Sequence, residues 1–128
     1  MKVVLKNRSV AFNKGYLYVL TESDTKTELI RLSSYEDGFS LSFDEDISRL
    51  IPFPGDDACV QAYKDGVVVH GIADEFACCI YNSILECIES YNYRDIDLQQ
   101  VTYINVENDK LCFYGCTSSR ENVKLIKE

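Results

Sequence analysis

Two Asp-Gly dipeptides, at positions 37–38 and 65–66, each separate a pair of segments that have the pattern of β-strands. A type I′ turn needs positive φ at both of its central positions, and Asp-Gly meets this requirement better than most dipeptides. After the first dipeptide, apolar residues alternate with serine over residues 39–43, as in a strand with one buried face. The chain is therefore expected to contain at least two antiparallel hairpins.

Further turns divide both ends of the chain into short strands. Asn13-Lys14-Gly15 separates residues 9–12 from 16–21, and the polar run 107–110 joins expected strands at 100–106 and 111–115. A last strand is expected at 122–126. No linker, low-complexity stretch or internal repeat is apparent, so residues 1–128 are expected to form one domain around a bent, mostly antiparallel sheet.

Two segments have the pattern of helices. An apolar stripe recurs every three or four residues and predicts a long amphipathic helix over residues 74–91. A short helix is predicted over 44–51, because three acids open it and Pro52 ends it. Together with the hairpins, these segments predict an α+β fold with the long helix packed on the sheet. The stripe consists of Phe76, Ile80, Ile84, Ile88 and Tyr91.

The net charge of −8 is concentrated in the middle of the chain. Residues 22–97 hold 17 acids and five bases, a net charge of −12, whereas residues 1–21 hold four bases and no acid. A field of this sign repels nucleic-acid phosphates and attracts basic surfaces. Direct binding of DNA or RNA is therefore not expected, and the expected partner is a protein with a basic surface.

Catalytic and metal-binding patterns are sparse. His70 is the only histidine, so an imidazole mechanism would need it, in a dyad with Cys59, Cys78 or Cys79. Its place at the end of an expected strand favours a structural role instead. The run 44–46 lacks the glycine of a calcium loop, and the cysteines lack the paired spacing of a zinc site. No glycine-rich phosphate loop is found. The expectation is therefore a protein without a metal or cofactor, and not an enzyme.

Six cysteines could form three disulfides, but the chain begins with charged residues and lacks the apolar core of a secretion signal. Reduced thiols are therefore expected, in the cytoplasm of the source cell or of a host. Cys59, Cys87 and Cys112 lie within apolar patterns and are expected in the core. No apolar run approaches the roughly 18 residues of a membrane span, so no membrane partner is expected.

These observations favour a small, acidic, non-enzymatic inhibitor that occludes a basic, nucleic-acid-handling site on a partner such as a nuclease or a defence effector. Toxin-immunity proteins and phage counter-defence proteins, including anti-CRISPRs, are of this general type, by analogy of size, charge and absent chemistry. A small-ligand-binding module that uses the crevice between sheet and helix is the alternative. A Cys/His enzyme is a third hypothesis, and a homodimer is compatible with all three.

Two acidic patches are the candidate contact surfaces. Exposed tyrosines beside the second patch would add contact area at little entropic cost. The first patch consists of Glu36, Asp37, Asp44, Glu45 and Asp46, and the second of Asp74, Glu86, Glu89, Asp95 and Asp97, with Tyr91 and Tyr93.

Overall fold

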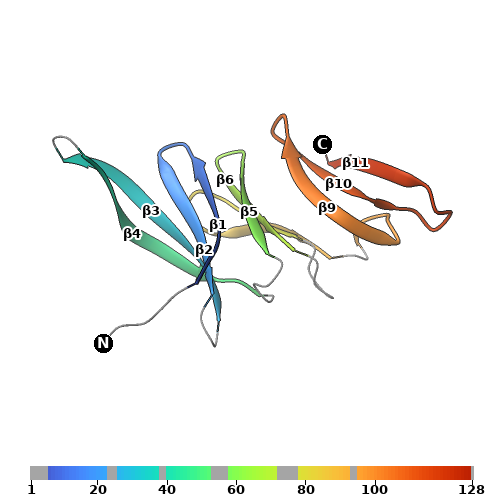
Figure 1. The fold of residues 1–128 in the computed structure, drawn as a ribbon, viewed down its shortest axis with the longest axis horizontal. Coiled ribbons are helices and arrows are strands. Elements are labelled where there is room, and N and C mark those ends of the chain that lie inside the picture. Colours follow the sequence, from blue (N-terminus) through green and yellow to red (C-terminus); the bar gives the residue numbers. More distant parts are fainter. Residues whose placement is uncertain are drawn as a thin grey trace.

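The computed structural model describes residues 6–22, 26–37, 40–52, 58–71, 78–92 and 95–127, and of residues 6–8, 34–37 and 40–46 only the backbone. Within these ranges the chain forms eleven β-strands and no α-helix (Figure 1). The strands are β1 (Lys6–Asn13), β2 (Tyr16–Glu22), β3 (Thr27–Asp37), β4 (Ser40–Leu50), β5 (Cys59–Tyr63), β6 (Gly66–His70), β7 (Cys78–Tyr81), β8 (Cys87–Tyr91), β9 (Gln100–Glu107), β10 (Lys110–Cys116) and β11 (Asn122–Lys127).

The strands pair in chain order and form three antiparallel sheets. Sheet A consists of β1 to β4, sheet B of β5 to β8, and sheet C of β9 to β11. Short hairpin connections favour this topology, because closing a short loop costs little entropy. The first strands of the sheets lie next to one another, β1 beside β5 and β5 beside β9. The expectation of a single bent sheet is therefore replaced by three sheets in series (Figure 1).

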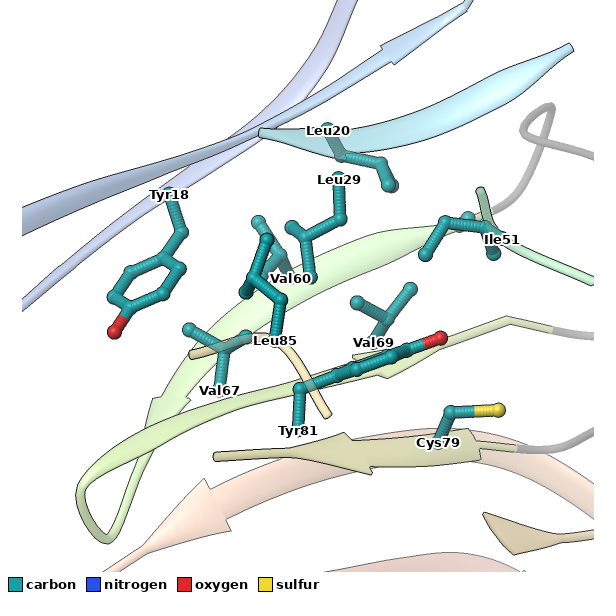
Figure 2. Packing of buried hydrophobic residues seen from close by; sticks show 11 residues of the cluster. Tyr18, Leu20, Leu29, Ile51, Val60, Val67, Val69, Cys79, Tyr81 and Leu85 are labelled. Carbon is teal, nitrogen blue, oxygen red and sulfur yellow. The ribbon is translucent and has the colours of Figure 1, made fainter. Parts of the chain in front are cut away.

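Sheet B lies between the other two sheets and is buried on both faces. β6 and β7 are buried at every position, which explains why three valines follow one another at 67–69 without alternation. Figure 2 shows the core between sheets A and B, where side chains from the two sheets face one another. This core contains Tyr18, Leu20, Leu29, Ile51, Val60, Val67, Val69, Cys79, Tyr81 and Leu85. The core between sheets B and C contains Tyr63, Val68, Cys78, Ile80, Ile96, Leu98, Val101, Ile104, Leu111 and Phe113.

Positive φ angles mark the tight turns that the sequence predicts at both ends of the chain. Lys14 and Gly15 join β1 to β2 with φ values of 50° and 87°, and Asn108 and Asp109 join β9 to β10 with values of 51° and 59°. Positive φ at both central residues is typical of the type I′ turn, whose twist matches that of the flanking strands. The strands expected around these turns and at the end of the chain are confirmed.

Both Asp-Gly hairpins are confirmed, although the second glycine has a different role from the one predicted. In the first hairpin, the last pair joins Asp37 to Ser40, so Asp37 belongs to β3 and the turn is moved forward by one residue from the predicted position. In the second hairpin, Gly66 pairs with Tyr63 and the turn is moved back by one residue. A Cβ at Gly66 would clash with the carbonyl oxygen of Tyr81. The glycine therefore allows β6 and β7 to approach closely.

The long helix predicted over residues 74–91, and with it the α+β fold, is wrong. Its described part consists of β7, a turn at 82–86, and β8. Ile80 is buried as predicted, but Ile84 and Ile88 are 51% and 55% exposed. A strand buried on both faces has a continuous apolar run, which periodicity alone does not distinguish from a buried helix. Pairing with β6 decides the conformation of this segment.

The short helix predicted over residues 44–51 is also wrong, because the segment belongs to β4. β4 pairs with β3 over its whole length, with a bulge that displaces the register next to Arg31 and Leu32. Long-range pairing outweighs the local preference of three acids for a helix N-terminus. Pro52 still follows the end of the element, as expected for a residue that cannot continue a hydrogen-bonded ladder.

Leu85 and Ile84 provide a direct test of this conformation. Leu85 is fully buried between sheets A and B, whereas its neighbour Ile84 is half exposed. Leu85→Ala is expected to lower the free energy of unfolding by about 2–5 kcal/mol through lost transfer energy and a residual cavity. Ile84→Ala is expected to lower it by less than about 1 kcal/mol. Urea denaturation of both variants measures the difference. A larger loss of stability for Ile84→Ala than for Leu85→Ala would support the predicted helix instead.

Candidate functional site

The turn between β7 and β8 is built around the side chain of Asn82. Its Oδ1 accepts hydrogen bonds from the backbone N–H of Ile84 at 3.1 Å and of Glu86 at 2.9 Å. Such a side-chain acceptor satisfies turn N–H groups that no strand partner reaches. Sheet A holds the same turn from the other side, because Arg31 donates to the carbonyl of Ser83, and Arg49 donates through Nε to that of Leu85 at 2.8 Å.

A pocket of about 460 Å³ opens beside this turn, between the end of β4 and the strands β7 and β8. Its walls carry one charge of each sign, from Arg49 and Glu86, together with apolar and thiol groups. The size is within the range of small-molecule sites. The lining residues are Arg49, Leu50, Pro52, Cys79, Tyr81, Glu86, Cys87 and Ser90.

Three groups in this pocket interact, and burial keeps two of them, Cys79 and Tyr81, protonated at neutral pH. The thiol of Cys79 has hydrogen-bond interactions with the Cys87 thiol and the Tyr81 hydroxyl. Burial raises the pKa of Cys79 to about 12 and also raises the pKa of Tyr81. A thiol in this state is a poor nucleophile, because the thiolate is the reactive form. The arrangement therefore favours non-covalent contacts in the pocket over thiol chemistry.

Of the described acids of the second patch, Glu86 lines this pocket, Glu89 lies on β8, and Asp95 and Asp97 lie on the chain that follows. We call Glu86, Glu89, Asp95 and Asp97 the acidic rim, and all four residues are exposed. Lys127 forms an ion pair of 3.1 Å with Glu89, and the Tyr91 hydroxyl donates to the same carboxylate at 2.6 Å. These hydrogen bonds lower the pKa of Glu89. Asp74 and Tyr93, predicted with this patch, lie outside the described residues.

The five residues of the first patch all lie on one long hairpin, formed by β3 and β4. Glu36 and Asp37 occupy the end of β3, and Asp44 and Glu45 pair with Ser33 and Leu32 across the hairpin. The bulge falls at residue 46. The backbone therefore spreads this patch along one hairpin of sheet A, from its tip at Asp37 to Glu45, whereas the acidic rim belongs to sheet B and the chain next to β8.

His70, the candidate catalytic base, is held in a neutral form by its neighbours. Gln61 Oε1 accepts a hydrogen bond from the backbone N–H of Val106 at 3.0 Å, so its amide nitrogen is the donor at 2.5 Å from His70 Nε2. Nε2 must then be unprotonated. Burial lowers the pKa of His70 to about 4. Cys59 and Cys78 are its cross-strand neighbours, but burial raises the pKa of Cys78 to about 12. Both shifts oppose a thiolate–imidazolium pair.

The cysteines are distributed differently from the expectation. Cys112 is buried as predicted, but Cys59 and Cys87 are exposed, and Cys78 and Cys79 are buried instead. Within the described part of the chain, no three histidine, cysteine or acidic side chains are placed to hold a metal ion. In the same residues, no helix is long and apolar enough to cross a membrane.

Comparison with known proteins finds no matching family, no matching curated protein and no matching solved structure. The walls of the pocket come from three segments, at the end of β4, on β7, and on β8 with Glu86 before it, and no sequence pattern associates these segments. Their association depends on the packing of sheet A on sheet B, and no local motif signals it. Of the rim acids, Glu89 lies on β8, and Glu86, Asp95 and Asp97 lie on the chain before and after it, so the sequence identified them through their nearness along the chain.

The buried His70 should make stability depend on pH. Its pKa is about 4 in the folded protein, against 6.5 for an unperturbed histidine, so the unfolded chain binds more protons between these values. Stability is therefore expected to fall as the pH drops through this window, by up to about 3 kcal/mol. His70→Gln should remove this loss. Urea denaturation of both proteins across the window measures the difference. Parallel curves would show that the pKa of His70 does not change on folding.

Native thiol reactivity should follow exposure. Cys59 and Cys87 are expected to react rapidly with a disulfide reagent, whereas the buried Cys78, Cys79 and Cys112 should react only after unfolding. All six thiols should titrate in the freshly prepared, denatured protein. Cys59→Ser with Cys87→Ser provides the matched control and should lose the rapid phase. A rapid phase that survives this double substitution and also the addition of Cys116→Ser, which removes the half-buried thiol of sheet C, would contradict the placement of sheet B.

Proposed function

We propose that the chain is a non-enzymatic binding protein whose acidic rim docks on a basic surface of a protein partner. The observation that carries the proposal is the composition of β8 and the chain after it. Ile88, 55% exposed, lies on an edge strand between Glu86 and Glu89, and Asp95 and Asp97 follow. An exposed apolar residue among charges is typical of an interface with a small apolar centre and a polar periphery.

The charge of the rim favours a basic partner. Among the salt bridges of the described residues, the one that reaches the rim joins Lys127 to Glu89, which leaves a net negative surface. Exposed charges steer encounter and are screened over a Debye length of about 8 Å at physiological salt. A partner that handles nucleic acid has a surface of the required sign, and a bound acidic protein would occlude it. The proposal therefore includes inhibition of such a site.

The properties of the remaining groups support a binding role in the cytoplasm. His70 is neutral and hydrogen-bonded, and the Cys78 and Cys79 thiols have raised pKa values. Cys79 and Cys78 each contribute to one of the two cores. Buried free thiols persist in a reducing compartment, so we place the protein in a cytoplasm, of its source cell or of a host.

The pocket beside the rim supports a second candidate function, the binding of a small ligand. A molecule with an acidic group and an apolar body would match Arg49 and the apolar wall formed by Leu50 and Pro52. The crevice between sheets A and B takes the place of the sheet–helix crevice that the sequence suggested. A bound metabolite in protein purified from the source organism would favour this function over protein binding.

Asp97→Lys and Glu121→Lys form a matched pair for testing the protein-binding function, because both residues are exposed and both substitutions change the net charge equally. Immobilised wild type should retain a partner from an extract of the source organism. With that partner purified, Asp97→Lys is expected to slow association about 3- to 10-fold at low salt, and Glu121→Lys to leave it nearly unchanged. Surface plasmon resonance across a salt series measures both rates. An affinity that stays constant from low to high salt would contradict the proposal.

A further inference from the structure

The first two strands of each sheet form the same unit. Each unit is a hairpin in which a two-residue turn follows the last pair of residues on the two strands. In the first unit, this last pair is Asn13 and Tyr16. The three units are residues 10–19, 60–69 and 104–113. Counted from the turn, the same four positions are apolar in every unit. These residues are Val10, Phe12, Leu17 and Val19; Val60, Ala62, Val67 and Val69; and Ile104, Val106, Leu111 and Phe113. The register thus reveals an internal repeat that is not apparent from the sequence alone.

The four positions lie on one face of each sheet, which we call the rear face; the opposite face is the front face. In sheet B, this rear face packs on the front face of sheet A, where Tyr18 and Leu20 meet Val60, Val67 and Val69 (Figure 2). In sheet C, the rear face packs in the same way on the front face of sheet B. The chain therefore contains two joints of one type, each between a front face and the next rear face.

Polar side chains reinforce both joints in the same manner. Asn13 of sheet A donates to the carbonyls of Lys64 and Gly66 at 3.0 and 2.7 Å. Gln61 of sheet B donates to the carbonyl of Ile104 at 3.2 Å and accepts from the N–H of Val106. In each case, the first strand of one sheet binds the backbone of the next sheet's first hairpin. These bonds fix the offset of the neighbouring sheets.

On its β1 side, the rear face of sheet A lacks this covering among the residues that the structure describes, whereas Val19 on the β2 side is 8% exposed. Val10 and Phe12 are 57% and 58% exposed, whereas Val60 and Ile104, at the position of Val10, are each 3% exposed. Neither Val10 nor Phe12 belongs to a core cluster. The same position that is buried in two sheets is thus exposed in the third.

The front face of sheet C is the complementary end of the series. Tyr103 and Ile126 are 55% and 50% exposed on it, and the rings of Tyr103 and Tyr114 lie 5.7 Å apart. Asn105 occupies the position that Gln61 has in sheet B, two residues before the end of the first strand. The described part of the chain therefore ends in a rear face that is exposed along β1 and a front face that is exposed at Tyr103 and Ile126. On this front face, Glu107 also accepts hydrogen bonds from Tyr114 and Lys124, so polar groups lie beside the exposed apolar ones.

We propose that two copies of this chain associate head to tail, with the rear face of sheet A of each copy on the front face of sheet C of the other. Antiparallel sheets that stack with their first strands together are the arrangement of β-propellers, which close with four to eight sheets. With three sheets in each copy, six is the one multiple in this range. A front-to-rear contact between copies is heterologous, and such contacts form rings when the rotation closes.

Sedimentation equilibrium of the full chain tests the proposal, with an expected mass twice the 14.6 kDa of one chain. A rear-face variant, Val10→Glu with Phe12→Glu, and a front-face variant, Tyr103→Glu with Ile126→Glu, should each be monomeric. Both pairs of side chains are exposed in one chain, so the variants should keep the circular dichroism spectrum of the wild type. Ile88→Glu, which changes an exposed residue on neither of these two faces, should remain dimeric and provides the control.

Mixing distinguishes a head-to-tail joint from other dimers. The rear-face variant keeps an intact front face and the front-face variant an intact rear face, so an equimolar mixture should associate although neither variant does alone. A wild type that stays monomeric up to about 100 μM would overturn the proposal. A front-face variant that stays dimeric would also overturn it, because rear faces would then pair with each other. Dimerisation of the wild type only after removal of residues 1–5 would overturn it as well.

Discussion

Burial of sheet B on both faces is the constraint on which the arrangement of the molecule depends. Val67, Val68 and Val69 alternate between the two cores, so one short strand contributes to both. Each fully buried valine stabilises the fold by about 1.5–3 kcal/mol relative to an exposed one. The faces of sheets A and C that belong to the two cores are buried through contact with this central sheet. A substitution in β6 therefore affects both joints, whereas one on β11 affects a single joint.

Polar contacts set the orientation that apolar packing leaves free. Asn13 and Gln61 bind backbone groups of the following sheet, and Arg31 and Arg49 of sheet A hold the carbonyls of the β7–β8 turn. Buried or half-buried backbone groups need such partners, because an unpaired one costs about 1–3 kcal/mol. The contact of Gln61 with His70 follows from the same requirement. The imidazole is thus part of a joint between sheets, which accounts for its neutrality.

The hairpins could be predicted from the sequence because turn chemistry is local. Lys14, Gly15 and Asn108 mark turns whose φ requirements few residues meet, and the strands around them were located nearly to the residue. The segment 74–91 could not be predicted, because a strand buried on both faces followed by a tight turn produces a helix-like spacing of isoleucines. Ile84 and Ile88 are exposed because the pairing of β7 with β6 makes this segment a strand and a turn, and not a helix. The acids of the rim are exposed, but their separation from the first patch on sheet A depends on long-range register.

The two proposals concern different surfaces of the molecule and are compatible. The acidic rim lies on β8, the last strand of sheet B, and on the chain that follows it, whereas the proposed joint uses the outer faces of sheets A and C. Association of two copies would therefore leave the rim exposed and would present it twice in one particle. Two identical sites on one particle raise the effective concentration of the second site once the first is bound, provided that the partner offers two basic surfaces at a matching distance. A partner with one such surface would bind each rim independently. The stoichiometry of the complex would then report the assembly state of this chain, and its salt dependence would report the rim.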